Sequence, residues 1–455
     1  MRPLLIALLL GCTGLATPAE DPSTDQDGEV DNGDDDKADV DEGVEDVADR
    51  APPLVTTDPA NAPARKYDGP KVDLYLSAGN HEIDAAGEVT RSCNNENSLN
   101  CRIYKVTWDL AEQRATTVQT VVDDPAFATI YPVISPNGLY MANTSATIRR
   151  GRVRKAMNHT VHVRDLSKWR GGAHPIIHSI EEAKWPGWND DDTLLITRFS
   201  DKHWGDVMSV GRESGTPKRV LGPGATKKGP SFSQARTNPV DSNLVATHGD
   251  DVYKGKHGAT VPHVNHLGNG KQWGFDMDRD GDGSPDIVGC AHTAWTPDGN
   301  GVVCTEQFTD DYPYEGGPDY NHLHLFEKKG DSYAMVNANP TQKGYLFKPK
   351  SPEELRSFHP DYFTKDHPNP AGGGYCEGTV YYKNALYCGN DHTVVLTLWC
   401  IDTKNYNARR KVINSRAVLV DFEDWNNPKH YDITSSLEAA GMVSGAQSDF
   451  VHCYQ

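Results

Sequence analysis

One turn pattern recurs along the chain, and it narrows the folds that the chain can adopt. Residues 131–143 (YPVISPNGLYMAN) and 291–306 (AHTAWTPDGNGVVCTE) each contain an apolar strand, a Pro-Asx-Gly turn and a second apolar strand. Residues 185–198 and 235–248 are variants of this unit. The units return about every 50 residues, a period typical of repeated supersecondary units. Further strands follow several units, at 159–168, 204–210 and 321–330.

Antiparallel units at this period predict an all-β chain folded as a β-propeller, because each blade buries its faces only against its neighbours. About seven blades fit the chain length, with roughly six or eight as alternatives, and an array of β-sandwiches is the alternative architecture. The Ser/Thr-Pro-Asp/Asn-Gly turn after an aromatic strand resembles the repeat of TolB-type propellers over most of residues 120–400. This resemblance implies a TolB- or WD40-like propeller, which we place at residues 67–455.

The first residues, MRPLLIALLLGC, predict export. An early arginine and a short apolar run form a secretory signal that is too short to span a bilayer. Leu9-Leu10-Gly11-Cys12 resembles the lipobox of bacterial lipoproteins. The resemblance implies a signal peptide at 1–11 and a lipid on Cys12 that anchors the chain in the bacterial cell envelope, on the periplasmic side or at the cell surface. A plain signal peptide cleaved near 16–19 is the alternative.

An acidic stretch follows the signal. Residues 21–50 contain fourteen Asp or Glu against Lys37 and Arg50, and so carry −12 of the chain's formal charge of −19. The stretch has no aromatic residue and cannot bury enough apolar surface to fold. We interpret 12–66 as a disordered acidic linker, with calcium buffering as an alternative role. The sequence has no basic block, so we expect no nucleic-acid partner.

Cysteine use agrees with an exported protein. Besides Cys12 the chain has eight cysteines, and this even number predicts disulfides in an oxidising compartment. A thiolate zinc site is the alternative, although the sequence has no Cys-x-x-Cys. Spacing along the chain suggests the pairs Cys93–Cys101, Cys290–Cys304, Cys376–Cys388 and Cys400–Cys453.

The repeats also predict where polar side chains gather. In an antiparallel blade the end of the second strand lies beside the start of the first strand. Residues at these places should surround a central mouth at one end of the propeller axis, and they form a candidate site. The alternative is a polar lining of a water-filled channel. Alignment of the second strands on their last residue and of the first strands on the turn proline gives two sets: Asn143, Arg198, His248 and Glu306, and Tyr131, Gln234 and His292.

Two further histidines resemble a metal-binding pair. His322 and His324 point to one face of a strand. However, Leu323-His324-Leu325 matches Val161-His162-Val163 in another unit. A histidine that recurs on the third strand, away from the axis, is expected to pack within its blade rather than bind metal.

A second resemblance involves His248 and His292. The stretch NPVDSNLVATHG, followed later by AHTAWTPDG, resembles oligogalacturonate lyases, which are TolB-like propellers. The resemblance implies that His248 is the catalytic base and that His292 binds a divalent metal such as Mn²⁺. His367 and Asn369 would be further ligands, with asparagine in place of the family's second histidine.

Elimination from a uronic acid needs two more groups. The substrate carboxylate must be neutralised, by the metal or by Arg198, and the leaving oxygen needs an acid, for which Tyr131 is the candidate. Two functions follow. The first is a non-catalytic propeller that binds a glycan, peptide or envelope protein at the mouth. The alternative is a polysaccharide lyase that cleaves uronate-containing glycans by β-elimination. The sequence has no Gly-x-Ser-x-Gly, so we do not expect a serine hydrolase.

Residues 278–286, DRDGDGSPD, form a candidate calcium loop. Oxygen ligands at alternate positions can wrap one hard cation, and a glycine permits the sharp turn. The four carboxylates of Asp278, Asp280, Asp282 and Asp286 fit this pattern. An all-carboxylate cage suits a structural Ca²⁺ that fixes the loop leading into Cys290 and His292.

We expect chelation of calcium to lower the melting temperature of the exported domain, and Asp280→Ala to reproduce that loss. Calorimetry with and without EGTA, combined with measurement of bound calcium, tests this. Unchanged stability and calcium content in Asp280→Ala would show that the loop is not a metal site.

Overall fold

A computed structural model describes the chain at residues 54–55, 63–80, 82–83, 89–91, 93, 101–124, 127–147, 159–169, 174–199, 204–222, 232–251, 259–278, 289–306, 322–336, 341–342, 344–350, 379–402, 411–443 and 447–454. The chain divides into Met1–Arg50 and Ala51–Gln455, and the described residues all belong to the second unit. The predicted signal peptide, Cys12 and the acidic stretch at 21–50 lie outside them. No helix in these described ranges is long and apolar enough to cross a membrane.

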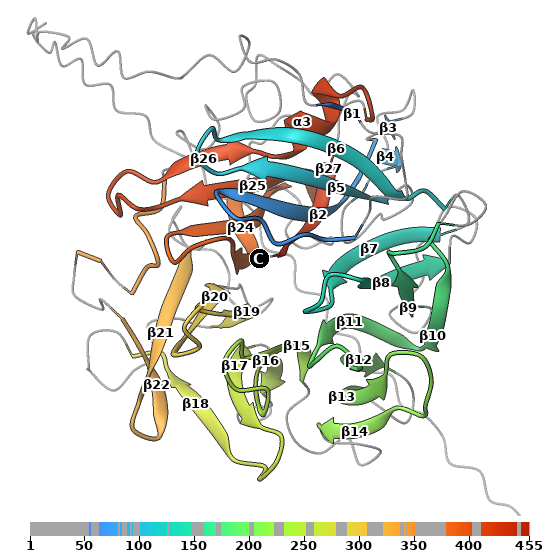
Figure 1. The fold of residues 1–455 in the computed structure, drawn as a ribbon. Coiled ribbons are helices and arrows are strands. Elements are labelled where there is room, and N and C mark those ends of the chain that lie inside the picture. Colours follow the sequence, from blue (N-terminus) through green and yellow to red (C-terminus); the bar gives the residue numbers. More distant parts are fainter. Residues whose placement is uncertain are drawn as a thin grey trace, which may run out of the picture. The chain divides into compact units, whose positions relative to one another are not determined.

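The described strands form a β-propeller of six four-stranded antiparallel blades, within the predicted range (Figure 1). The first blade contains β27 (Gln447–Tyr454), β2 (Lys71–Gly79), β5 (Arg102–Asp109) and β6 (Arg114–Val122), and the second contains β7 (Phe127–Ile134), β8 (Tyr140–Thr147), β9 (His159–Asp165) and β10 (Ile176–Glu181). The third contains β11 (Ala183–Trp188), β12 (Thr193–Phe199), β13 (Trp204–Gly211) and β14 (Lys218–Leu221), and the fourth contains β15 (Ser233–Thr237), β16 (Leu244–Asp251), β17 (Ala259–His266) and β18 (Gln272–Asp276). The fifth contains β19 (Cys290–Trp295), β20 (Gly301–Glu306), β21 (Leu323–Lys329) and β22 (Ser332–Met335), and the sixth contains β23 (Thr379–Tyr387), β24 (Thr393–Asp402), β25 (Lys411–Asp421) and β26 (Lys429–Asp432).

Short elements extend this frame. β1 (Leu54–Val55) pairs in parallel with β6, so contacts with the propeller begin before the predicted domain start at residue 67. β3 (Glu82–Ile83) and β4 (Val89–Arg91) form a separate pair. β18 and β22 pair in parallel and join the outer edges of the fourth and fifth blades. The helix α3 (Thr434–Ala439) leads from the sixth blade toward β27.

The C-terminal strand closes the ring. β27 pairs with β2 and is the innermost strand of the first blade, so the two ends of the domain share one sheet. One apolar cluster then joins Leu74 and Leu76 of the first blade to Val395 and Leu419 of the sixth. These four side chains are fully buried, which is typical of blade faces that pack on a neighbour.

Disulfides confirm part of the predicted cysteine pairing. Cys93–Cys101 and Cys290–Cys304 form as expected. The pairs Cys376–Cys388 and Cys400–Cys453 were wrong, because Cys388 bonds Cys453. Ring closure brings the turn after β23 beside β27, and this contact between distant residues cannot be read from local spacing. Cys376 and the side chain of Cys400 lie outside the described part. Three disulfides indicate an extracytoplasmic protein.

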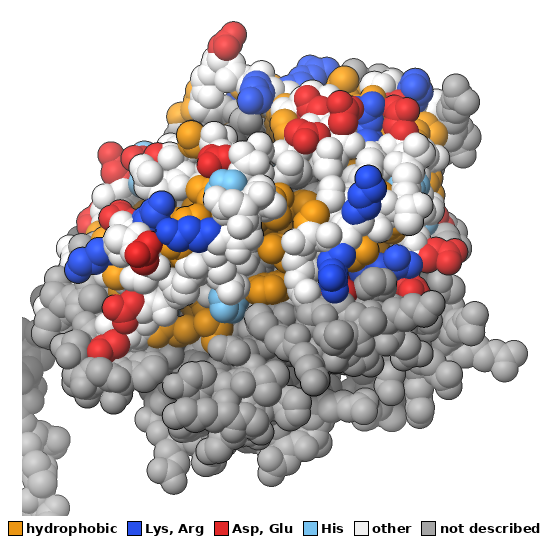
Figure 2. Space-filling model, turned by 90° about the horizontal axis from the view of Figure 1, so that it is seen from below, with side chains coloured by type: hydrophobic (Ala, Val, Ile, Leu, Met, Phe, Trp, Pro, Cys, Tyr) orange, Lys and Arg blue, Asp and Glu red, His pale blue; other side chains and the backbone are white. Residues whose placement is uncertain are grey.

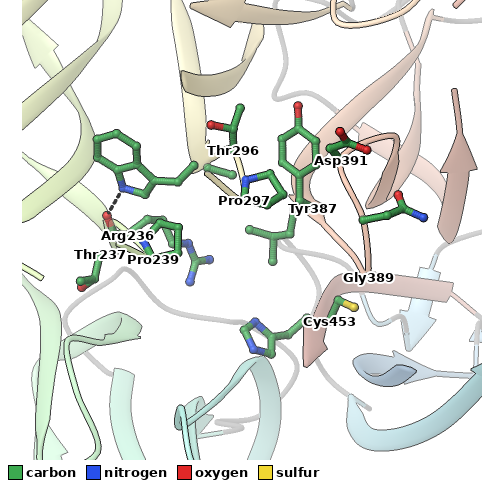
Figure 3. A pocket seen from close by; sticks show the side chains of 14 residues that line it. Arg236, Thr237, Pro239, Thr296, Pro297, Tyr387, Gly389, Asp391 and Cys453 are labelled. Atoms are coloured by element: carbon green, nitrogen blue, oxygen red, sulfur yellow. Dashed lines mark hydrogen bonds between the residues drawn. The ribbon is translucent and has the colours of Figure 1, made fainter. Parts of the chain in front are cut away.

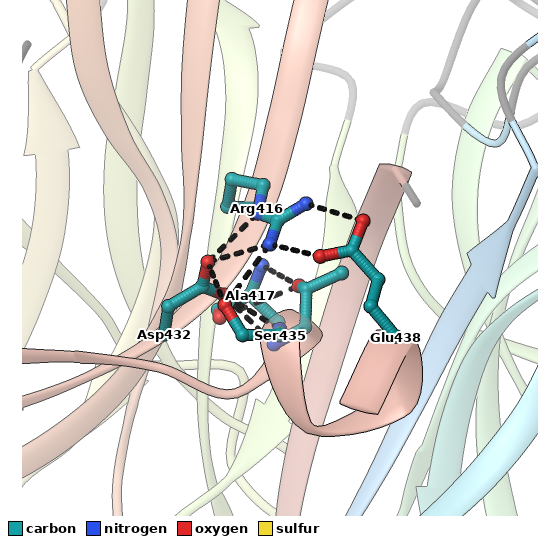
Figure 4. A network of polar contacts seen from close by, with 6 residues as sticks. Arg416, Ala417, Asp432, Ser435 and Glu438 are labelled. Atoms are coloured by element: carbon teal, nitrogen blue, oxygen red, sulfur yellow. Dashed lines mark hydrogen bonds and ion pairs between the residues drawn. The ribbon is translucent and has the colours of Figure 1, made fainter. Parts of the chain in front are cut away.

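A buried ion network fastens α3 to the sixth blade (Figure 4). Arg416 on β25 is fully buried, and its Nη2 lies 2.6 Å from Asp432 Oδ2 and 3.0 Å from Glu438 Oε2. Ser435 donates to the same Asp432 oxygen at 2.7 Å. Since α3 precedes β27, the network sets the path of the closing strand.

The six blades surround one axis, and the two ends of this axis differ in the kind of connection that they carry. At the end that we call the turn end, first and second strands are joined by tight turns at 135–139, 189–192, 238–243, 296–300 and 388–392. At the opposite end, the loop end, the connecting segments 148–158, 252–258, 307–321, 351–378 and 403–410 lie outside the described residues. The mouth predicted from the sequence corresponds to the loop end.

We expect Arg416→Met to lower the free energy of unfolding by about 3–5 kcal/mol, because two carboxylates would lose their buried counter-ion. Denaturant unfolding of the exported domain measures this change. The control is Arg114→Met, which removes an exposed ion pair with Glu112 and should cost less than about 1 kcal/mol. Equal losses in the two variants would contradict a structural role for the network.

Candidate functional site

The innermost strands share one distortion. In five of them a bulge interrupts pairing with the second strand, and the bulged residue has a positive φ of 50–56°. A positive φ disfavours residues other than glycine, so its recurrence marks a built feature that redirects a side chain. We call these five the bulge residues: Tyr131, Trp185, Gln234, His292 and Asn384. The predicted equivalence of Tyr131, Gln234 and His292 is therefore confirmed.

Side chains of the preceding blade hold several bulges. The backbone N–H of Trp185 donates to Thr144 Oγ1 at 3.2 Å, and that of Gln234 donates to Thr197 Oγ1 at 3.3 Å. In the next blade His248 replaces threonine, and its Nδ1 accepts the N–H of His292 at 3.2 Å. His248 thus performs a structural task that a hydroxyl performs elsewhere.

The strand register corrects the predicted second-strand set. Ser233 pairs with His248, whereas the equivalent first-strand residues pair with Thr144, Thr197, Thr305 and Thr397. Asn143 lies one residue before the equivalent position, and Arg198 and Glu306 lie one residue after it, because the last residue of a strand does not mark the same register in each blade. One step along a strand moves a side chain to the other face.

The contacts of these three residues agree with the correction. Arg198 Nη2 lies 3.6 Å from Glu182 Oε2. Asn143 accepts from Arg164 within the second blade, and Glu306 bonds His324 Nε2 at 3.0 Å within the fifth. The expectation that His324 packs within its blade is confirmed, and His162 likewise bonds Ser179 Oγ.

The bulge residues converge across blades. Tyr131 lies edge-on to Trp185 with ring centroids 6.4 Å apart, and Trp185 lies 6.4 Å from His248. The rings of His248 and His292 are 5.3 Å apart, and His292 Nδ1 lies 2.7 Å from Gln234 Oε1. The sequence therefore correctly brings Tyr131, His248 and His292 into one group.

Hydrogen bonding assigns a tautomer to each ring. Because His248 Nδ1 accepts an N–H, the neutral imidazole carries its proton on Nε2 and acts there as a donor. With the Gln234 amide oriented so that its Oε1 faces His292 Nδ1, His292 is assigned its proton on Nδ1 and a lone pair on Nε2. His248 in this tautomer does not suit the role of a base, whereas His292 keeps a free acceptor.

Burial and positive charge keep both imidazoles neutral. Burial lowers the pKa of His248 to about 3, and Arg236 and Lys383 add to the effect. Burial also lowers the pKa of His292 well below its usual value, with Lys383, Arg236 and Lys184 as nearby cations. Lys184 and Lys383 are themselves buried, with Lys184 Nζ 4.5 Å from the centre of the Trp185 ring. Cations and hydrogen-bond donors therefore lie close together near the propeller axis.

The described residues do not complete a metal site. Among them no group of three His, Cys, Asp or Glu side chains is arranged to hold an ion. His292 supplies one free lone pair, and that of His248 is engaged by a backbone N–H. His367, Asn369, Asp280, Asp282 and Asp286 lie outside the described residues, and of the calcium loop only Asp278 is described. The calcium and manganese sites stay predictions.

Polar atoms without partners gather where the fifth blade meets the sixth. Asn384 is 3% exposed, and neither its Oδ1 nor its Nδ2 has a hydrogen-bond partner within the described structure. Thr305 Oγ1, which stands in the position of the holding threonines, also has none there. We call this place the fifth–sixth seam, defined by Thr305 and Asn384.

A cavity of about 410 Å³ opens at the turn end, away from the predicted mouth (Figure 3). Arg236, two residues after the bulge of β15, contributes to its lining, and Trp295 Nε1 donates to the Arg236 carbonyl at 2.8 Å. On the outer surface, by contrast, Lys and Arg are interspersed with Asp and Glu over the described part (Figure 2), so neither sign of charge gathers there. The concentrated polar chemistry lies along the axis.

Comparisons with known proteins find similar solved structures at low sequence identity. No family model and no curated protein matches the sequence. Among solved structures, TolB from Acinetobacter baumannii is similar at 13% identity and a TM-score of 0.40, over 79% of this chain and 66% of that one. The chain thus matches just under two thirds of that TolB. Oligogalacturonate lyase from Vibrio parahaemolyticus is similar at 11% identity and a TM-score of 0.38, over 71% of this chain and 87% of that one.

The sheets of the described residues form a β-propeller, which confirms the fold predicted from the turn repeats. The identities and TM-scores carry the resemblance to TolB no further. Trp185 and Asn384 escaped the sequence alignment, because their turns carry Asp190 and Gly389 where the others have proline. A shared aromatic-Pro step, Tyr131-Pro132 and Trp185-Pro186, could have identified Trp185.

We expect His248→Thr to keep the melting temperature at neutral pH, because threonine accepts the same N–H in other blades. His248→Ala should cost about 1–3 kcal/mol, since it leaves the His292 N–H unsatisfied. The threonine variant should also be less sensitive to acid. The folded pKa of His248 is about 3 and the unfolded value about 6.5, so the unfolded chain alone binds this proton in that window and stability falls as pH drops through it.

Calorimetry from pH 7 down to pH 4 tests both parts. The control is His392→Thr, in a turn on the surface, where the side chain is 36% exposed. If His248→Thr and His248→Ala lose equal stability at neutral pH, the imidazole does not serve as the hydrogen-bond acceptor.

Proposed function

We propose that this protein is a lipid-anchored, extracytoplasmic β-propeller that binds an acidic glycan at the loop end of its axis. Three disulfides support export, and the lipobox-like Leu9–Cys12 supports the lipid anchor. The proposal includes a structural Ca²⁺ in the loop at 278–286, which leads into the strand that carries His292. The acidic linker would hold the propeller away from the membrane.

The fifth–sixth seam carries the proposal. A buried amide without partners costs about 1–3 kcal/mol, so three such atoms at one place favour a ligand that satisfies them. Asn384 offers one donor group and one acceptor, and Thr305 offers a hydroxyl. This combination suits sugar hydroxyl groups, which both donate and accept.

The neighbouring side chains favour a glycan that carries carboxylates. Lys184 and Lys383 supply positive charge, and the Nε2–H of His248 supplies a donor. Trp185, which is partly exposed, adds aromatic surface of the kind that packs against sugar rings.

Polysaccharide lyase activity is the second candidate. The contact between His248 and His292 favours it, because the two histidines of the lyase resemblance do meet. The tautomer of His248 opposes its implied role as base, since it presents a proton, whereas the lone pair on His292 Nε2 agrees with the implied metal ligand. In a lyase His292 would therefore be the better base, and His248 could donate to the leaving oxygen. Non-catalytic binding uses the arrangement as it stands.

We expect the exported domain to bind at least one of pectate, alginate, ulvan and glycosaminoglycan oligosaccharides in calorimetric titrations. Asn384→Ala should weaken binding by about tenfold, which corresponds to roughly 1.4 kcal/mol. The control is Asn300→Ala, on an exposed turn at the other end of the axis. No binding to any of the four, or equal binding by both variants, would contradict the proposal.

Ultraviolet absorbance during the same incubations separates binding from elimination. A binding protein gives a flat trace while calorimetry shows heat. A rise that His248→Thr abolishes would establish the lyase instead, because this variant is designed to keep the fold.

A further inference from the structure

The cavity at the turn end has no role in the function proposed above. It draws residues from the fourth, fifth, sixth and first blades, and its volume of about 410 Å³ falls within the range of small-molecule sites. Two of its lining residues carry unusual polar groups: Arg236 from β15 and His452 from β27.

Arg236 is a cation without a counter-ion among the described residues. Its guanidinium has no hydrogen bond and no ion pair within the described residues, and it lies 5.5 Å from the centre of the Phe450 ring. Burial lowers its pKa to about 10, so it stays charged at neutral pH. A partly buried guanidinium with five unused N–H donors is a strong site for a planar anion.

His452 adds a second unpaired group. Its Nδ1 is buried and has no hydrogen-bond partner in the described structure. Burial and the charge of Arg236 lower its pKa to about 3, so the imidazole is neutral. A neutral imidazole beside one guanidinium leaves the wall with a single positive charge, which matches a ligand that carries a single negative charge.

The remaining walls set the character of the ligand. Pro239, Ala294, Pro297 and Leu386 give the cavity apolar sides, and Asp391 is its carboxylate. The Asp391 side chain is 89% exposed and bonds His392, so it leaves the guanidinium free. One cation and an acidic group in the lining disfavour a dianion such as phosphate. Apolar walls favour an organic body on the anion.

We infer that the turn-end cavity is a binding site for a small organic monocarboxylate, held through its carboxylate by Arg236. The guanidinium donates two parallel hydrogen bonds to the carboxylate oxygens, and the neutral His452 forms part of the wall beside them. The apolar part of the ligand lies against the two prolines and Leu386. This site is separate from the glycan site, because the bulge residues and the fifth–sixth seam do not line it.

Saturation-transfer NMR with acetate, hexanoate, benzoate and phenylacetate tests the inference on the exported domain. We expect binding of the carboxylates with apolar bodies, and at least a tenfold weaker signal for methyl phenylacetate, which lacks the charge. Inorganic phosphate should not compete. Arg236→Gln should abolish binding, and Arg236→Lys should weaken it because lysine cannot form the two parallel bonds.

Two variants control the experiment. Lys71→Gln removes a cation from the neighbouring cavity of about 460 Å³ and should leave binding unchanged. Asn384→Ala, which tests glycan binding, should also leave it unchanged, so the two proposals fail separately. No carboxylate binding, binding that survives in Arg236→Gln with an unchanged melting temperature, or equal binding of acid and ester would each overturn the inference.

Discussion

The bulge on the innermost strands is the constraint on which the rest of the axis depends. Each bulged residue adopts a positive φ and turns its backbone N–H away from its own blade. That N–H must find an acceptor, because an unsatisfied buried amide is costly. Thr144, Thr197 and His248 supply the acceptor from the preceding blade. The same bonds therefore couple neighbouring blades and aim the side chains that form the candidate site.

The hydrogen bond that His248 accepts gives this residue a structural role, which argues against a purely catalytic interpretation. Its Nδ1 replaces a hydroxyl in a structural series, so its place beside His292 follows from blade packing. The imidazole still brings something that threonine lacks, namely a second nitrogen that carries a proton. Where the series stops, at Thr305, neither that hydroxyl nor the side chain of the following bulge residue has a hydrogen-bond partner among the described residues. The break in the series, rather than the histidine pair, is where we propose that a ligand binds.

The sequence alone predicted contacts between residues that lie close together along the chain better than contacts between distant residues. The turn proline fixed Tyr131, Gln234 and His292, because it lies a constant distance from the bulge. Second-strand residues were misaligned by one position, since the last residue of a strand does not mark the same register in each blade. Cys93–Cys101 and Cys290–Cys304 are local and were found. Cys388–Cys453 depends on ring closure, and so does the cavity that joins Arg236 to His452. No pattern in the sequence links β15 to the last strand.

The two ends of the axis differ in what they can recognise. Near the loop end, amide and hydroxyl groups accompany lysines, so neutral and charged parts of a polyhydroxy ligand can both be satisfied. At the turn end one guanidinium stands in an apolar frame. Arg236 connects the two regions electrostatically, since it helps to keep His248, His292 and His452 neutral. An anion bound to Arg236 would offset that charge and raise the pKa of all three imidazoles. Burial is the larger cause of each low pKa, so the imidazoles would stay neutral at pH 7 and the donors and acceptors presented toward the loop end would not change.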